Sequence, residues 1–306
     1  MSEITKSSFK PSIHRHESFV LRRGWLHKGL RNVMKEPKLF SNSNINPCDI
    51  LGVGTNMVKS LRYWLKATQM ITDVNGIQKI TDYAEIILKY DPYFEERGTK
   101  YLIHYFLASN KESATTWWWF FNIHKGKTID KEQFLSDYSE YLKIYTNTTL
   151  SRKVLESEFS TLIRTYCSKE EIEDDPEETK ICPLSELRLI SLIKQERGKK
   201  IYKKNVPDKD DIHPLIAFSI ICNKQAELNS NEIQISELLN GENNIGRIFN
   251  LDRTTVFYLI ERMEKLDLIK IVRTAGLDVI RIKKEMRFKE GMKEYYKNLF
   301  GEANNE

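Results

Sequence analysis

Two predicted helices carry outward-facing side chains that can donate to nucleic acid. In the stretch 244–272, five such residues lie on the outward side of one helix: Arg253, Thr254, Thr255, Tyr258 and Arg262. Arginine can pair bidentately with guanine, and threonine or tyrosine hydroxyls can hold phosphates. A helix-turn-helix presents the N-terminal part of its second helix to the major groove. The stretch therefore predicts a DNA-recognition helix.

Three further residues frame this predicted recognition helix. Arg247 and Asn250 lie just before it, and Arg273 lies at the turn of the hairpin that is predicted to follow. From that turn Arg273 can reach a phosphate or the minor groove. These three residues extend the predicted DNA-contact set beyond the helix.

A weak internal repeat places a second candidate near the N-terminus. A shift of 198 residues brings Val58 onto Val256 and Leu61 onto Leu259. The outward residues of this first copy are predicted to be Thr55, Asn56, Lys59, Ser60 and Arg62. The basic residues expected near them are Arg22, Arg23 and Lys28. We therefore predict a second DNA-contact set here.

Both copies show the same order of elements: a short helix, a tight turn, a longer helix and a β-hairpin. Apolar residues at helical spacing predict the helices, and β-branched runs on either side of a turn predict the hairpins. This is the order of a winged helix-turn-helix. We expect a mainly α chain with N- and C-terminal winged helix-turn-helix domains flanking a helical middle domain. The expected parts are a flexible tail at 1–12, the N-terminal winged domain at 13–92, the middle domain at 93–200, the C-terminal winged domain at 201–290 and a basic helical tail at 291–306.

The middle region is predicted to be helical, including residues 182–195. Its most unusual feature is the run of five aromatic residues at 117–121. Five consecutive side chains on a helix cannot all face one way, so we expect most of them in the core. The alternative is a base-stacking platform in which Trp117 or Trp118 is partly exposed.

No catalytic or metal-binding motif emerges from the sequence. His14 and His16 resemble a metal pair that His104 and His124 can join in space, but no spacing requires it, and tail histidines without a metal are the expectation. A metal-dependent nuclease needs carboxylates that converge on a cation. Residues such as Asp82 show no spacing that singles them out. We predict no metal site and no assigned catalytic residue.

The net charge of +5 conceals an uneven distribution. Basic segments at 15–38 and 281–297 lie next to the two candidate modules, and residues 170–178 carry seven acids. We expect the acidic run to be a solvated loop, with a shield that mimics DNA as the alternative. No apolar stretch is long enough to span a membrane, and no signal peptide is evident. We therefore expect a cytoplasmic protein without a membrane partner, and its oligomeric state stays open.

Several stretches together resemble a known bacterial family. They are FVLRRGWLHKGL (19–30), LGVGTNMVKSLRYWLKAT (51–68), YLIHYFLA with WWWFFN (101–122), LIRTY (162–166) and CPLSELRLI (182–190). The chain resembles the domain-of-unknown-function family numbered 4007 over roughly 15–290. Members of that family are encoded with sulfur-transfer proteins that place phosphorothioates in DNA, and one is the nicking component of the Ssp antiphage system.

The resemblance implies a DNA-handling protein that works with an ATPase and a sulfur-transfer enzyme. It carries over no catalytic residue. Our leading hypothesis is DNA binding within a phosphorothioate modification and defence system, with nicking that uses Mg²⁺ or Mn²⁺ left open. The alternatives are a non-enzymatic transcription regulator and a scaffold whose winged helices dock proteins.

Overall fold

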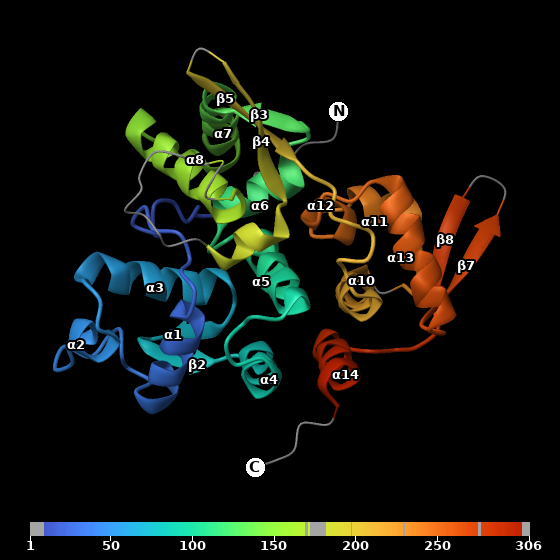
Figure 1. Ribbon diagram of the computed structural model, residues 1–306, viewed down its shortest axis with the longest axis horizontal. Helices are drawn as coiled ribbons and strands as arrows, with labels where there is room; N and C mark the ends of the chain where they lie inside the picture. Colours follow the sequence, from blue (N-terminus) through green and yellow to red (C-terminus); the bar gives the residue numbers. More distant parts are fainter. Residues whose placement is uncertain are drawn as a thin grey trace. The chain divides into compact units, whose positions relative to one another are not determined.

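The computed structural model describes residues 9–301 apart from 169–170, 172–181, 197, 229 and 275–276. Its contacts divide the chain into two compact units (Figure 1). Unit 1 joins the residues up to Ile80 to Phe106–Asn205, and unit 2 joins Thr81–Tyr105 to the residues from Val206 onward. Most elements are helices, so the expectation of a mainly α chain is confirmed. The stretches predicted as N-terminal and middle domains lie largely in one unit.

The N-terminal part of unit 1 consists of three helices and a hairpin, in the predicted order. The elements are α1 (Trp25–Lys35), α2 (Pro47–Leu51), α3 (Thr55–Ala67), β1 (Ile71–Val74) and β2 (Ile77–Ile80). Gly52 adopts a left-handed conformation (φ 60°) at the end of α2, which suits a residue without a side chain. Strands β1 and β2 are antiparallel, with Ile71 opposite Ile80. We call residues 25–80 the N-terminal module.

The middle part of unit 1 is less helical than the sequence indicates. Its elements are α6 (Thr115–Trp118), a π-helical turn at Trp119–Ile123, β3 (Thr128–Asp130), α7 (Lys131–Thr146), α8 (Arg152–Tyr166), a 3₁₀ turn at Pro183–Leu187, β4 (Ile190–Glu196) and β5 (Lys199–Lys204). The strands form one antiparallel sheet in the order β3-β5-β4. The predicted helix over 182–195 is therefore wrong. Arg188 turns left-handed (φ 50°) after the 3₁₀ turn, and the following residues pair with β5 instead of continuing a helix.

The aromatic run at 117–121 lies wholly in the core of unit 1. Each of the five side chains is at most 2% exposed. The helix changes from α to π geometry within the run, and the rings reach different neighbours: Trp117 contacts Trp64, Trp119 contacts Tyr138, and Phe121 contacts Tyr166. Core packing is confirmed. The alternative of a partly exposed Trp117 or Trp118 is wrong, which removes the base-stacking platform.

Unit 2 contains the second predicted module. Its elements are α4 (Asp82–Tyr90), part of α5 (Arg97–Ser109), α10 (Pro214–Leu228), β6 (Glu232–Gln234), α11 (Ile235–Asn240), α12 (Ile245–Ile248), α13 (Arg253–Lys265), β7 (Ile269–Thr274), β8 (Leu277–Ile282) and α14 (Phe288–Phe300). The predicted hairpin is present as β7 and β8, although its Gly276 turn lies outside the described residues. A short strand, β6, was not predicted and makes the sheet order β6-β8-β7. We call residues 214–282 the C-terminal module.

Gly246 allows α12 to approach α11 closely. A Cβ atom at this position would lie 2.3 Å from the Leu239 carbonyl oxygen and 2.6 Å from its Cα atom. Backbone atoms cannot give way as a flexible side chain can. We therefore expect Gly246→Ala to destabilise unit 2 by about 2–3 kcal/mol, in the upper range for overpacking.

Hydrogen exchange followed by mass spectrometry measures this loss, read from the unit 2 amides for Gly246→Ala and from the unit 1 amides for its control. Gly54→Ala is the matched control because a Cβ there meets nothing within 4 Å. It changes only an N-cap preference and is expected to cost less than about 1 kcal/mol. Equal protection in the two variants would contradict the close approach at Gly246.

Among the described residues, the helices are too short or too polar for any of them to traverse a lipid bilayer.

Candidate nucleic-acid interface

The exposed side of α3 is a stripe of polar and basic residues. Thr55, Lys59, Arg62 and Lys66 follow each other at intervals of three or four residues, which places them on one side of the helix. Thr55, Lys59 and Lys66 are exposed, and Asn56 lies exposed beside them. The opposite side is buried through residues such as Leu61 and Leu65. Because α3 contains no acidic residue, its solvent-facing side is positive along its length.

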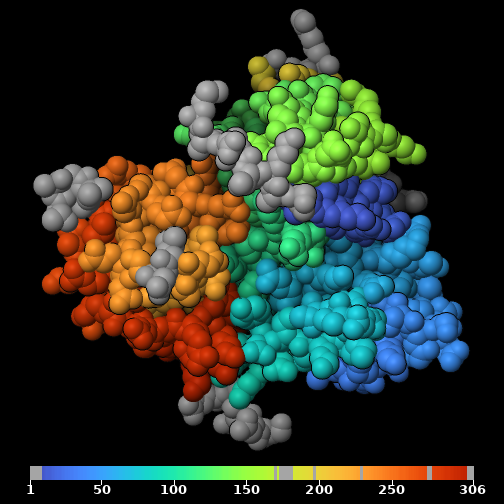
Figure 2. All heavy atoms as spheres, turned by 180° about the vertical axis from the view of Figure 1, so that it is seen from behind, coloured from blue at the N-terminus to red at the C-terminus, as the bar shows by residue number. Residues whose placement is uncertain are grey.

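Helix α1 adds a second basic stripe to the same module. Lys28, Arg31 and Lys35 have the same helical spacing and are exposed. The buried sides of α1 and α3 pack together where Gly29 faces Leu61 and Leu65. Residues 9–80 contain twelve Lys or Arg against four Asp or Glu. In Figure 2 this module, in blue, lies at the surface of the molecule. The excess of basic residues in this part of the chain can therefore attract a polyanion.

The structure separates the predicted residues of this module into free and engaged groups. Asn56 accepts a long hydrogen bond from Lys59 Nζ (3.4 Å), and neither Lys59 nor Lys66 forms an ion pair with a described carboxylate. The guanidinium of Arg62, by contrast, binds Asp73, with Nε at 3.0 Å from Oδ2. Burial raises the pKa of Asp73, but hydrogen bonds from Arg62 and Gln78 outweigh it and keep that pKa low. Arg62 therefore holds the hairpin against α3.

One predicted outward orientation in this set is wrong. Ser60 is 0% exposed, because it lies on the packed side of α3 next to Leu61 and not on the stripe.

The basic residues at the start of α1 also have protein partners. Arg22 donates to Met57 Sδ and lies over the rings of Phe19 and Trp25. Arg23 pairs with Glu186 at 2.6 Å. Lys28 Nζ donates to the Leu51 carbonyl oxygen at 3.1 Å and remains exposed. Lys28 therefore has no carboxylate of the described residues within 4 Å, whereas the charge of Arg23 is offset by Glu186.

Helix α13 of the C-terminal module presents a different surface. Its Arg253 is 74% exposed but lies 3.7 Å from Asp278. Tyr258 and Arg262 both donate to Asp210, and Glu261 and Glu264 lie on the exposed side of the helix. Thr254 is exposed. The positive charge of α13 is therefore largely offset locally, unlike that of α3.

The remaining predicted residues of the C-terminal module are spread around α13. Thr255 is buried (8% exposed), because it lies on the packed side of the first turn of α13, so its predicted outward position is wrong. Its amide donates to Asp252, the N-cap. Arg247 donates to the Asn240 carbonyl oxygen, and Asn250 takes a left-handed conformation (φ 55°) before the helix. Arg273 is exposed near the end of β7.

The buried histidines serve packing and hydrogen bonding. His16, expected in a loose segment, is 1% exposed, and its Nε2 lies 2.9 Å from Glu158 Oε1. His104 Nε2 donates to the Ile248 carbonyl oxygen at 2.7 Å, and burial lowers the pKa of His104 to about 4. Burial also lowers the pKa of His124 to about 4. Within the described part of the chain, no three His, Cys, Asp or Glu side chains are grouped so that they can hold a metal ion.

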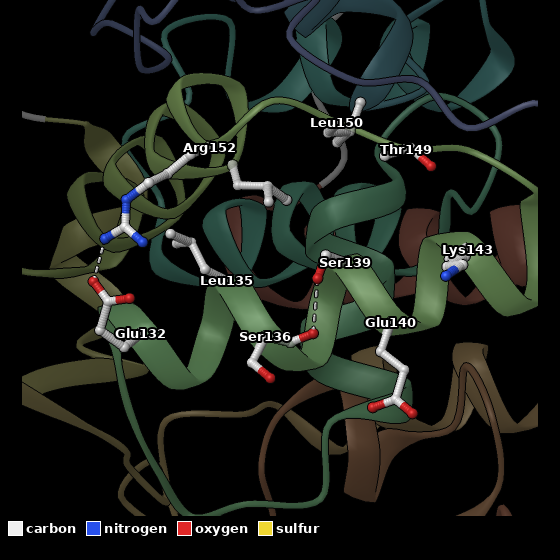
Figure 3. Close-up of a pocket in the computed structure, with 10 residues that line it drawn as sticks. Glu132, Leu135, Ser136, Ser139, Glu140, Lys143, Thr149, Leu150 and Arg152 are labelled. Atoms are coloured by element: carbon white, nitrogen blue, oxygen red, sulfur yellow. Dashed lines mark hydrogen bonds and ion pairs between the residues drawn. The ribbon is translucent and has the colours of Figure 1, made fainter.

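An open pocket of about 650 Å³ lies between α7 and the segment that leads into α8 (Figure 3). Leu135 and Leu150 lie on its two sides, and Arg152 pairs with Glu132 at its rim. Ser139 hydroxyl donates to the Ser136 carbonyl oxygen. Among the described residues, neither serine of the lining forms a hydrogen bond with Glu132, Glu140 or Lys143, which is the pairing that activates a nucleophile.

Comparisons with known proteins agree on the fold. A family described as "Protein of unknown function (DUF4007)" matches residues 13–296. The crystal structure named "Magnesium ion-bound SspB crystal structure" superposes with a TM-score of 0.86 at 21% identity, over 99% of this chain and 93% of that chain. A second SspB crystal structure gives a TM-score of 0.81 at 19% identity, over 98% and 91%. No curated protein matches the chain.

Proposed function

The chain belongs to the DUF4007 family, and from this premise we propose that it is a DNA-binding protein of a bacterial phosphorothioate modification and defence system. It acts in the cytoplasm beside an ATPase and a sulfur-transfer enzyme. The N-terminal and C-terminal modules are winged helices in this proposal, and α3 of the N-terminal module is the principal recognition helix. The likeness to SspB supports the placement in such a system through the shared fold.

The observation that carries this proposal is the exposed stripe of α3. It combines Lys59 and Lys66 with Thr55 and Asn56, in a helix without acidic residues and in a module rich in Lys and Arg. Lysines in this arrangement neutralise phosphates, and asparagine can pair with the adenine edge in the major groove. A protein-docking helix does not require this concentration of unpaired positive charge.

Titration of a fluorescent 20-base-pair duplex with the full chain at several salt concentrations tests the proposal. Binding through several phosphates requires the logarithm of the affinity to fall steeply with the logarithm of salt concentration, by about 0.9 per phosphate. Binding absent at low salt would overturn the proposal and favour the docking scaffold. Binding that depends on one operator-like sequence would favour the transcription regulator.

Nicking is a further step of this proposal that rests on the family resemblance. The described residues supply no carboxylate cluster for Mg²⁺ or Mn²⁺, so we assign no residue to a metal-dependent step. Supercoiled plasmid incubated with the pure chain and either cation measures nicking directly. Accumulation of open circles that stops with EDTA supports it, and their absence over a range of cation concentrations contradicts it.

A further inference from the structure

Two hydrogen-bond donors of α13 converge on a single carboxylate. The hydroxyl of Tyr258 donates to Asp210 Oδ1 at 2.6 Å, and Arg262 Nη1 lies 3.4 Å from the same oxygen. Asp210 precedes Tyr258 by 48 positions and Arg262 by 52 positions in the sequence, but all three residues lie in unit 2. Helix α13 is drawn in orange in Figure 1. The donors therefore form a small site for an oxyanion, and Asp210 fills it.

Two cations lie beside the Tyr258 ring at this site. The guanidinium of Arg262 lies over the Tyr258 ring at 5.5 Å, and Lys209 Nζ lies 5.1 Å from the same ring. The hydrogen bond to Asp210 raises the pKa of Tyr258, so the hydroxyl remains a donor. A hydroxyl and a guanidinium are the donors with which proteins hold nucleic-acid phosphates. The same donors that bind the carboxylate can therefore bind a phosphate.

The occupant of the site lies on a short acidic loop. The segment 208–211 carries three aspartates and one lysine, and Asp210 is 65% exposed. The adjacent Asp211 binds Arg97 at 2.6 Å, which anchors one end of the loop within unit 2. An exposed carboxylate contributes little binding energy of its own, because water screens the pair. A phosphate can therefore displace Asp210 without unfolding the loop.

From this geometry we propose that Tyr258 and Arg262 form a phosphate site for the DNA backbone that Asp210 occupies in the free protein. The carboxylate acts as a built-in competitor, so the C-terminal module contributes to DNA binding only after Asp210 is displaced. This inference rests on the proposed function, because it names a second backbone contact for the same ligand. It also explains why the positive charge of the predicted recognition helix of the C-terminal module is offset by nearby carboxylates in the free protein.

The test compares two substitutions that change the net charge equally. Asp210→Asn removes the competing carboxylate, and Asp208→Asn removes an exposed carboxylate of the same loop that forms no ion pair with a described residue. With the full chain and the fluorescent duplex, we expect Asp210→Asn to raise affinity about fivefold, the upper range for an exposed ion pair, and to increase the salt slope by about one phosphate. We expect Asp208→Asn to raise affinity about twofold or less through net charge alone. Arg262→Gln added to Asp210→Asn restores the original net charge and removes the site, so the affinity should return to about that of the unsubstituted chain.

The outcomes separate this inference from the proposed function. If the unsubstituted chain binds DNA and the two Asn variants bind equally, the masked phosphate site is disproved while the proposed function stands. If Arg262→Gln leaves the gain of Asp210→Asn intact, the site is also disproved. If no variant binds the duplex, both proposals fall.

Discussion

Replacing Lys59 and Lys66 together by glutamate is expected to weaken binding to duplex DNA by about 100-fold. Each lysine is exposed on the stripe of α3, and loss of a phosphate contact removes about one unit of salt slope. The double variant should therefore lose about two units, and its remaining affinity should respond less to salt. Fluorescence anisotropy with the same duplex at several salt concentrations measures both quantities.

The matched control places the same charge change on the other module. Lys265→Glu with Lys270→Glu alters two exposed lysines of the C-terminal module, neither of which forms an ion pair with a described carboxylate. If net charge alone governs binding, both double variants lose affinity equally. We expect the affinity of the control variant for the duplex to fall by less than about fivefold, because only the long-range electrostatic attraction to the DNA is weakened. An equal loss would show that α3 is not the principal contact.

Replacing Glu158 by alanine is expected to destabilise unit 1 by about 3–5 kcal/mol. Glu158 is 1% exposed and accepts hydrogen bonds from the His14 amide (2.6 Å), His16 Nε2 (2.9 Å) and the Thr116 hydroxyl. The other side of the His16 ring is held through Nδ1, which lies 3.1 Å from the Ser18 amide nitrogen and 3.4 Å from the Thr161 hydroxyl. Alanine leaves these buried donors without an acceptor, and a buried polar group without a partner costs more free energy than removal of both partners would.

Tryptophan fluorescence during urea unfolding reports this loss for unit 1 alone. All five tryptophans of the chain lie in unit 1. Glu158→Gln is the matched control. Its carbonyl oxygen keeps the two acceptor contacts of Oε1, and its amide can donate to Thr116, whose hydroxyl lies 2.9 Å from that of Tyr138. We expect Glu158→Gln to cost less than half as much as alanine, and equal costs would contradict the hydrogen-bond assignment.

The same carboxylate should give unit 1 a sensitivity to acid. Burial alone would raise the pKa of Glu158, but attraction to His16 and hydrogen bonds from His16, Thr116 and the His14 amide hold it below the ordinary value of 4.5. A lowered pKa in the folded state stabilises the fold above pH 4.5, and this contribution is lost as the pH falls through the folded-state pKa. Urea midpoints between pH 6 and pH 3 should fall more for the unsubstituted chain than for Glu158→Gln. Parallel curves would be evidence against the shift.

Local patterns in the sequence predicted the helices and hairpins of both modules well. Helical spacing identified α3 and α13, and β-branched runs identified both hairpins, because these signals depend on neighbours within a few residues. The sequence analysis missed the β3-β5-β4 sheet of unit 1 because β4 is extended through its pairing with β5. A local apolar pattern at helical spacing does not reveal such pairing between strands. The run of aromatics was placed correctly in the core because no single helix face can hold it.

The sequence by itself determined the family resemblance, the order of elements in the two modules and the set of basic residues that can reach DNA. Only the tertiary structure decided which of those residues are free. Arg62 is bound by Asp73, and Tyr258 and Arg262 by Asp210, whereas Lys59 and Lys66 form no ion pair with a described carboxylate. His16, expected in a loose segment, is fixed by a glutamate 142 residues away. The reason is physical: helical periodicity is set by near neighbours, but the partner of a charge is set by how distant segments pack.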